Sequence, residues 1–381
     1  MINKVKKAFF KHFGSDAEFL TSAPGRVNLI GEHTDYNEGW VLPCAIEFRT
    51  LVAIRPRNDT LIRTIALDWQ SSTDEFDVSK PITFQENKMW SNYVRGVASE
   101  WMKAGYTLGG CDIAISGNVP QGAGLSSSAA LEIACVKAFA NLAGQTLNSL
   151  EMAKIAQLAE NNFVGCACGI MDQLISAAAV KDKALMIDCR DFELTPTAIP
   201  DSLSILIINS NVQRGLVDSE YNLRREQCEA VAKYLQMPSL RSVNIQQLEA
   251  IVGKIDSVAI KRARHVIEEN IRVTAMHQAL TKNDIPTISQ LMAESHQSMH
   301  QLFEITVPEI DLLVDIVAGV IGIKGGVRMT GGGFGGCIVA LLPEHLIASV
   351  ISSINTHYVT ASGLTATIYQ TKAAEGAVLL S

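Results

Sequence analysis

The sequence has no long apolar run and no block of basic residues, and these two absences exclude several classes of protein. No stretch offers the ~18 uninterrupted apolar residues that a membrane helix needs. The basic N-terminal segment lacks the apolar stretch of a signal peptide, and its pattern predicts an amphipathic helix. The net charge of −7 provides no electrostatic footprint for nucleic acid. We therefore expect a soluble, cytoplasmic protein that binds neither a membrane nor nucleic acid.

The spacing of a zinc or redox site is also missing. The eight cysteines contain no C-x-x-C pair, and the close pair Cys166 and Cys168 has no second pair to complete a metal site. Free cysteine behaves as a small hydrophobe, so we expect buried free thiols. His296 and His300 form an H-x-x-x-H pattern in a Met-rich helical segment, which we interpret as a polar helix face rather than as zinc ligands.

A chain of 381 residues is too long for one ordinary core, which predicts two domains. Helices are expected at the N-terminus, after Ser126, from Asn148 with a capping box to Glu151, and over residues 169–180. Strands are expected before Pro56, at 111–117, at 183–188 and at 203–211. The proline-containing link 189–202 is the candidate boundary, which gives domains of residues 1–190 and 200–381.

The second half combines long helices with a few strands. We expect helices from Asp218 to about His300 and over 344–359, a strand–glycine turn–strand unit over 327–342, and a last strand at 366–371. Strands and helices cluster more than they alternate, so the fold class is α+β.

The stretch PQGAGLSSSAALE, which begins at Pro120, has the composition of an anion-binding loop. Glycines let backbone N–H groups approach an anion, and the helix that follows offers unpaired N–H donors. The serine hydroxyls suit magnesium, which prefers oxygen ligands. A serine-capped helix after a glycine turn is the alternative. No lysine follows, so this is not a Walker A loop.

A second glycine cluster, Gly331–Gly336, formally contains G-x-G-x-x-G. The dinucleotide fingerprint must open a helix, whereas a β-type run, CIVALL, follows here. We expect a tight hairpin with close backbone packing, or a turn that lies against a ligand.

Two polar groups of residues stand out against apolar surroundings. GRVNLIGEHTDYNEGWVLP, from Gly25, supplies carboxylates, an imidazole and a hydroxyl that suit the hydroxyls of a sugar; a metal site and a solvated turn are the alternatives. Asp172, in CGIMDQL, is either a helix cap or a buried base.

These stretches resemble known motifs. GRVNLIGEHTDYNEGWVLP closely resembles the galactokinase signature, and NSNVQRGLVDSEYNLRREQC resembles another galactokinase segment. GAGLSSSAALE and MTGGGFGGCIVAL resemble the phosphate-binding motif and the third motif of the GHMP kinase superfamily. They occur in the order of the family and span nearly the whole chain. The cysteines of VGCACG depart from the pattern, and we expect no effect of them on the chemistry.

The resemblance implies a two-domain GHMP kinase fold of mixed sheets and helices, with the active site in the cleft between the domains. It implies ATP- and Mg2+-dependent phosphorylation of the C1 hydroxyl of α-D-galactose, the first committed step of galactose catabolism, by a monomer. Two alternatives remain open: a superfamily kinase for another acceptor such as homoserine, mevalonate or N-acetylgalactosamine, and a sensor that binds sugar and ATP without turnover.

The resemblance also implies site residues. Asp172 and Arg26 would serve catalysis, and Ser128 and Glu160 would bind magnesium. The sugar would contact Glu32, His33, Thr34, Asp35, Asp172 and Tyr221. ATP would lie on Gly122, Ala123, Gly124, Leu125, Ser126, Ser127 and Ser128, with Trp90 near the adenine.

Overall fold

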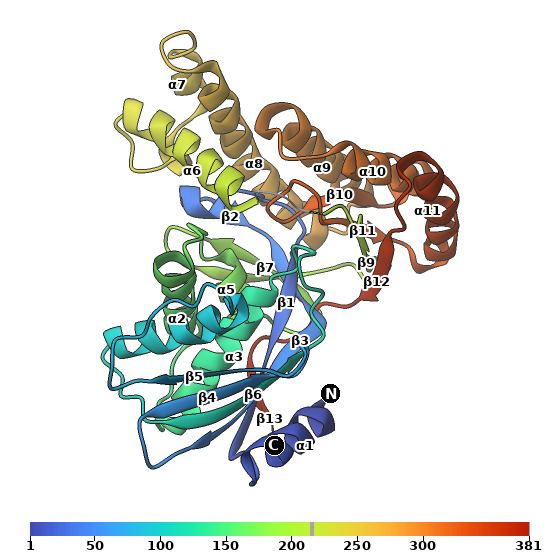
Figure 1. Ribbon diagram of the computed structural model, residues 1–381. Coiled ribbons are helices and arrows are strands. Elements are labelled where there is room, and N and C mark those ends of the chain that lie inside the picture. The colour runs from blue at the N-terminus through green and yellow to red at the C-terminus, as the bar shows by residue number, and fades with distance from the viewer. Residues whose placement is uncertain (214–216, 381) are drawn as a thin grey trace.

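The computed structural model describes residues 1–213 and 217–380, which form an N-terminal and a C-terminal lobe (Figure 1). The N-terminal lobe is built on a mixed six-stranded sheet in which only β4 and β6 pair in parallel. In sheet order its strands are β13 (Val378–Leu380), β1 (Phe19–Asn28), β3 (Pro43–Pro56), β6 (Cys111–Gly117), β4 (Leu61–Ala66) and β5 (Ser72–Asp77).

Helices cover both faces of this sheet. The amphipathic α1 (Ile2–Phe13) buries Val5 and Phe9 against one face, as its pattern predicted. The other face is covered by α2 (Met89–Lys103), α3 (Ser127–Leu142), α4 (Ser149–Leu158) and α5 (Met171–Ala178). Because α3 lies in the centre of this layer, it is apolar on nearly all sides.

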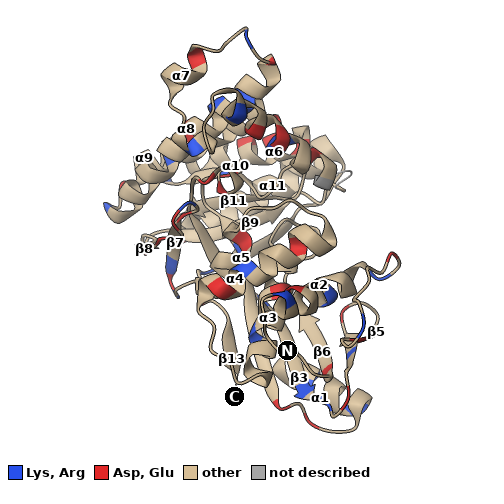
Figure 2. Ribbon diagram, turned by 90° about the vertical axis from the view of Figure 1, so that its left-hand side faces the viewer, with Lys and Arg blue, Asp and Glu red and all other residues tan. Residues whose placement is uncertain are grey.

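The C-terminal lobe packs helices against an antiparallel four-stranded sheet. Its strands, in sheet order, are β10 (Gly326–Thr330), β11 (Cys337–Leu342), β9 (Ser204–Asn209) and β12 (Thr367–Thr371). Its helices include α6 (Val217–Tyr234), α7 (Ile245–Glu249), α8 (Ser257–Thr281), α9 (Ile285–Ser298), α10 (Pro308–Ile321) and α11 (Ile347–Ser362). In the side view of Figure 2, basic and acidic residues are interspersed over both lobes.

The two lobes share an apolar core. One buried cluster combines Val27 and Leu29 of the N-terminal lobe with Ile207, Met276 and Val339 of the C-terminal lobe. A three-stranded sheet, β2 (Trp40–Val41), β7 (Lys183–Asp188) and β8 (Leu194–Ala198), lies between them and contacts α8. This shared core fixes how residues from the two lobes face one another.

Most of the predicted elements are confirmed. The helix from Asn148 has its capping box with Glu151, and the strands at 183–188 and 203–211 appear as β7 and β9. The strand–glycine turn–strand unit is the hairpin of β10 and β11. Of the segment Asn209–Cys228, residues 214–216 lie outside the part that the structure describes.

Two features differ from the predicted domain organisation. The link 189–202 contains β8, which pairs with β7; Pro196 is tolerated because β8 is an edge strand. The chain then returns to the N-terminal lobe, where β13 pairs with β1. The second domain is therefore not one unbroken segment from residue 200 onward. This return was not predicted, because a three-residue strand is too short to produce a sequence pattern.

No helix among the described residues has the length and the apolar character to cross a membrane.

Candidate active site

The loop Gly122–Ser128, called the glycine–serine loop below, connects β6 to α3. Gly122 and Gly124 have φ of 69° and 77°, which favour glycine. Ser126 is the N-cap residue of α3, but its side chain makes no capping bond; its Oγ donates to Asp172 Oδ2 at 2.5 Å. The first N–H groups of α3 therefore have no side-chain cap, which leaves a positive helix end for an anion.

Arg26 and Asp172 form a bidentate ion pair beside this loop. Arg26 Nε and Nη2 donate to Asp172 Oδ1 and Oδ2, both at 2.7 Å, and Nη1 donates to the Gly124 carbonyl at 2.6 Å. Burial alone would lower the pKa of Arg26, but Asp172 and Glu32 outweigh it and raise this pKa. Asp172 stands in the first turn of α5, and its side chain keeps 28% of its surface exposed.

A tight turn between β1 and β2 carries the acidic residues of the predicted sugar site. Thr34 Oγ1 lies 2.9 Å from the carbonyl of Gly31 and 2.7 Å from that of Trp40, its two acceptors. Thr34 is fully buried, and its hydroxyl holds the turn closed instead of facing a cavity. In the same turn, His33 has a left-handed backbone with φ 62°, and Asp35 begins the short 3₁₀-helix Asp35–Asn37.

Glu32 ties this turn to the C-terminal lobe. Its carboxylate accepts hydrogen bonds from Asn28 Nδ2 at 3.0 Å, the Gly331 backbone N–H at 2.8 Å and Arg328 Nη1 at 3.4 Å. Gly331 begins the second glycine loop, Gly331–Gly336, so one buried carboxylate joins residues about 300 positions apart.

Asp35 and His33 have shifted pKa values. Burial, and then the neighbouring Asp172, raise the pKa of Asp35 from its usual 3.8 to about 6. Burial, and then His265, lower the pKa of His33 to about 3, so His33 is neutral at pH 7. Its Nδ1 lies 2.8 Å from the Tyr36 hydroxyl, and its ring lies 4.9 Å from that of Tyr221 on α6.

These groups line one cavity of about 120 Å3, called the central cavity below. The structure therefore brings together seven of the predicted residues: Arg26, Glu32, His33, Asp35, Glu160, Asp172 and Tyr221. Thr34 is absent from its wall. The sequence reasoning did not place Cys166, Cys168, Gly169 and Met171 there, although all four line it. Their closeness to Asp172 in the sequence was the signal that could have placed them in the cavity wall.

An acidic pair lies behind the glycine–serine loop. Glu160 lies in the first turn of a π-helical segment, η2 (Ala159–Val164). Gln173 Nε2 donates to Glu160 Oε2 at 2.7 Å and to Glu132 Oε2 at 3.3 Å. Glu132 Oε1 is buried without a hydrogen-bond partner, and burial followed by Glu160 raises the pKa of Glu132 well above its usual value. A cation bound beside Glu132 and Glu160 would offset the repulsion between their two negative charges, so this pair suits a metal ion.

Magnesium fits this set of donors. Glu132 follows Ser128 by one helical turn and therefore shares its face of α3, a spacing that could have identified it from the sequence. Mg2+ usually takes one or two carboxylates together with phosphate oxygens. Among residues 1–213 and 217–380, no cluster of three or more His, Cys, Asp or Glu side chains is arranged to hold a metal ion.

A second cavity, of about 280 Å3, adjoins the glycine–serine loop on the side of α2. Gly122, Ser127 and Ser128 line it together with the predicted Trp90. Three further side chains contribute apolar surface there: Trp69, Met89 and Tyr93. Trp69 is 49% exposed and offers a flat aromatic surface at the edge of this cavity.

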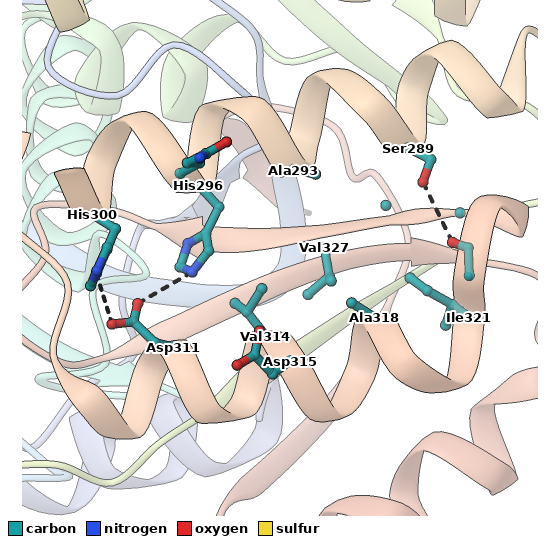
Figure 3. A pocket seen from close by; sticks show the side chains of 14 residues that line it. Ser289, Ala293, His296, His300, Asp311, Val314, Asp315, Ala318, Ile321 and Val327 are labelled. Carbon is teal, nitrogen blue, oxygen red and sulfur yellow. Dashed lines mark hydrogen bonds and ion pairs between the residues drawn. The ribbon is translucent and has the colours of Figure 1, made fainter. Parts of the chain in front are cut away.

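A larger cavity, of about 380 Å3, lies away from these loops, between α9 and α10 (Figure 3). Asp311 there faces His296 Nε2 at 3.3 Å and His300 Nδ1 at 3.0 Å. The expected polar helix face is correct for the half-exposed His300, whereas the His296 side chain is only 12% exposed and turns inward. The two histidines are thus partners of one aspartate.

Three family models match the chain. A galactokinase galactose-binding signature matches residues 7–56, the GHMP kinase N-terminal domain matches 92–179, and the GHMP kinase C-terminal domain matches 276–360. The first covers the turn with Glu32 and Asp35, and the second covers the glycine–serine loop and Asp172.

Solved structures agree with these matches. The crystal structure of Lactococcus lactis galactokinase with galactose is 30% identical, covers 100% of both chains and superposes with a TM-score of 0.94. Methanococcus jannaschii mevalonate kinase is 18% identical with a TM-score of 0.63 over 93% of this chain and 98% of its own. Streptococcus pneumoniae phosphomevalonate kinase is 12% identical with a TM-score of 0.65, over 92% and 99%. The last two share the fold.

Proposed function

We infer the reaction of this protein from one premise: the chain belongs to the galactokinase family of the GHMP kinases. It is an ATP-dependent sugar kinase that transfers the γ-phosphoryl group of ATP to the C1 hydroxyl of α-D-galactose. One observation supports this most directly. Asp172, paired with Arg26, faces the central cavity and is also bonded to Ser126 of the glycine–serine loop.

Galactose would occupy the central cavity. Asp35 offers carboxylate oxygens to vicinal hydroxyls, Glu32 retains one of about four lone-pair positions after its three donors, and neutral His33 contributes a ring nitrogen. Tyr221 closes the side formed by α6. Thr34 acts indirectly, because its hydroxyl holds the turn that presents Asp35.

ATP would place its phosphates on the glycine–serine loop. Ala123 and Leu125 bury their side chains in the core, so these positions offer only backbone N–H groups, while Ser127 and Ser128 offer hydroxyls. Trp90 and its aromatic neighbours in the second cavity would contact the adenine. The phosphates would then meet the positive end of α3.

Ser128 and Glu160 would hold Mg2+, and we add Glu132 as a third oxygen donor. When bound, the ion supplies charge neutralisation for the phosphate oxygens. Gln173 holds the Glu160 carboxylate in position by donating to its Oε2 at 2.7 Å.

Phosphoryl transfer asks the protein mainly for positioning and for charge stabilisation. Three donors already occupy the Asp172 carboxylate, so one lone pair remains for the C1 hydroxyl. Asp172 orients this hydroxyl for attack and receives its proton as the new P–O bond forms. Arg26 holds Asp172 in place from both oxygens and contributes positive charge beside the γ-phosphoryl group.

The acceptor is tested by ADP release with a panel of galactose, N-acetylgalactosamine, glucose, mevalonate and homoserine. Galactose should be turned over fastest, and phosphorus NMR of the product should show a phosphate on C1. If N-acetylgalactosamine or mevalonate is turned over faster than galactose, that compound is the acceptor and the assignment of galactose is wrong. Binding of galactose and ATP without ADP release would indicate a sensor.

Several coarser properties belong to the same proposal. We propose a cytoplasmic monomer that binds neither nucleic acid nor a membrane. We also propose domains of residues 1–190 and 200–381, amended by the return of β13 to the N-terminal sheet. Sedimentation of the purified protein measures the oligomeric state directly.

A further inference from the structure

Two cysteines in the wall of the central cavity differ from all the others. Cys166 and Cys168 are half-buried and line the cavity, whereas the remaining six cysteines are buried. Burial also raises the pKa of Cys44 and of Cys228 to about 12, which removes the reactive thiolate. An oxidant that reaches the sugar site therefore meets these two thiols first.

The backbone holds these two thiols close together. The Cys168 N–H donates to the Cys166 carbonyl at 2.8 Å, which is the bond of a γ-turn centred on Ala167. Such a turn is shorter than two residues of extended chain, which span roughly 6.6 Å, so the Cα atoms fall in the separation range of disulfides. Both side chains also line the same cavity.

Contacts from the C-terminal lobe fix this turn in place. The Ala167 N–H donates to Asn222 Oδ1 at 3.3 Å, and its carbonyl accepts from Arg225 Nη1 at 2.8 Å, both from α6. With Ala167 held by the C-terminal lobe, both thiols remain on the cavity side.

We propose that Cys166 and Cys168 form a reversible disulfide when a peroxide enters the central cavity, and that this disulfide switches the kinase off. The inference rests on the proposed function only for its activity readout. The other parts of the proposal concern thiol chemistry, which can be measured without any substrate.

The reaction balances with a peroxide as oxidant. The sulfur of Cys166 attacks the O–O bond and becomes a sulfenic acid, and one water leaves. The Cys168 sulfur then displaces the hydroxyl of this sulfenic acid, and a second water leaves as the S–S bond forms. The two thiols give up two electrons and the peroxide accepts them. Cys168 takes the second role because its sulfur is already held by Asn161 and Gln173.

The disulfide would disturb the site through contacts that the thiol now makes. The Cys168 thiol donates to Asn161 Oδ1 at 3.2 Å and receives a weak bond from Gln173 Nε2 at 3.8 Å, the same nitrogen that holds Glu160. Oxidation removes the thiol donor. It also pulls on Gly169, where an added Cβ would lie 2.1 Å from Asp35 Oδ2, so little space exists for movement.

The test treats the reduced protein with hydrogen peroxide, removes it, and measures intact mass, the Cys166–Cys168 peptide and ADP release with galactose. We expect loss of two hydrogens at this peptide and a roughly 10- to 100-fold fall in kcat/KM, the scale of a misplaced site. Dithiothreitol should restore both, and galactose present during oxidation should slow both.

Variants separate the disulfide from other damage. C166S and C168S are each compared with their own untreated form, so that any change in basal activity cancels. After peroxide treatment, neither variant should lose two hydrogens at this peptide. Neither variant should show the inactivation that dithiothreitol reverses in the parent protein. C228S, in the buried core, is the matched control and should respond to peroxide like the parent protein. If this substitution weakens folding and activity, mass spectrometry should still show the loss of two hydrogens at the Cys166–Cys168 peptide.

Three outcomes would overturn the inference: a disulfide at other cysteines, oxygen addition at Cys166 without an S–S bond, or a Cys166–Cys168 disulfide with unchanged turnover. If the reduced protein lacks galactose-dependent ADP release but the disulfide forms, the proposed function fails while the thiol chemistry stands.

Discussion

The two glycine-rich loops have similar compositions but opposite environments. The glycine–serine loop precedes a helix, and a Cβ added at Gly122 would meet no atom within 4 Å. The second loop connects two strands, and its glycines lie against protein: a Cβ at Gly333 would lie 2.6 Å from the Ile305 carbonyl, and one at Gly331 would lie 3.1 Å from that of Gly124. The element after each loop decides this difference.

A loop that precedes a helix presents backbone N–H groups without intrahelical partners. In the hairpin loop, by contrast, backbone N–H groups donate to protein acceptors. The Phe334 N–H donates to Ile305, and the Gly331 N–H donates to Glu32. The first loop is therefore suited to an anion, whereas the second supports the turn of the sugar site and contributes Gly331 and Gly332 to the wall of the central cavity. Counting glycines in the sequence does not distinguish these two uses.

The largest expected effect comes from glycine substitutions that separate packing from binding. Gly333→Ala places a side chain at φ 88° against Ile305 and should lower the free energy of unfolding by about 2–5 kcal/mol, the sum of the left-handed and overpacking costs. Gly122→Ala, in open space at φ 69°, should cost only about 1–2 kcal/mol and should raise KM for ATP. Urea unfolding and kinetics measure both. Equal destabilisation would remove the distinction.

Asp172→Asn tests the chemistry beside the first loop. The amide loses the anionic acceptor for the hydroxyl proton and the ion pair with Arg26, so kcat should fall by roughly 10²-fold or more. Galactose binding, measured by calorimetry, should change much less. Unchanged kcat would end the assignment of Asp172 as base.

Ser128→Ala asks whether the first loop supplies a magnesium ligand. Removal of one hydroxyl should raise the magnesium concentration at half-maximal rate by about tenfold, the value of one good oxygen contact. Ser352→Ala, a surface substitution in α11, serves as control. A magnesium titration identical to that of the parent would exclude Ser128 as ligand.

The smallest effect concerns Asp35, whose pKa of about 6 is raised by burial, then by Asp172 beside the first loop, with a smaller effect of Glu32, which the second loop holds. Galactose affinity should fall severalfold as pH drops through 6 and Asp35 is protonated. Calorimetry from pH 7.5 to 5 measures this, and a flat profile would contradict it.

The same pKa fixes the sign of a stability effect. The folded protein binds more protons at Asp35 than the unfolded chain does between about pH 4 and 6, so the contribution of this group to stability falls as pH rises through that window. Asp35→Asn should therefore raise the melting temperature at pH 7.5 while weakening galactose binding.

Much of the fold and of the site was readable from local pattern. The capping box at Asn148 and Glu151, the strand at Ile113 and Ile115, and the hairpin around the second glycine loop depend on neighbouring residues alone. Motif resemblance then located seven residues of the central cavity. The strands β4, β5 and β13 were not assigned, because each has six residues or fewer. The helix α2 was also not assigned, although Trp90, Val94, Val97 and Trp101 recur at helical spacing.

The sequence by itself determined the family, the order of the motifs and the kind of side chain at each predicted position. Only the tertiary structure decided that the Thr34 hydroxyl supports a turn, that Glu132 joins Glu160, and that Cys166 and Cys168 share a cavity wall with Asp35. Local propensity acts over a few residues, whereas these contacts require the lobes to share one core. Burial and charge then give each side chain properties that its position in the sequence does not contain.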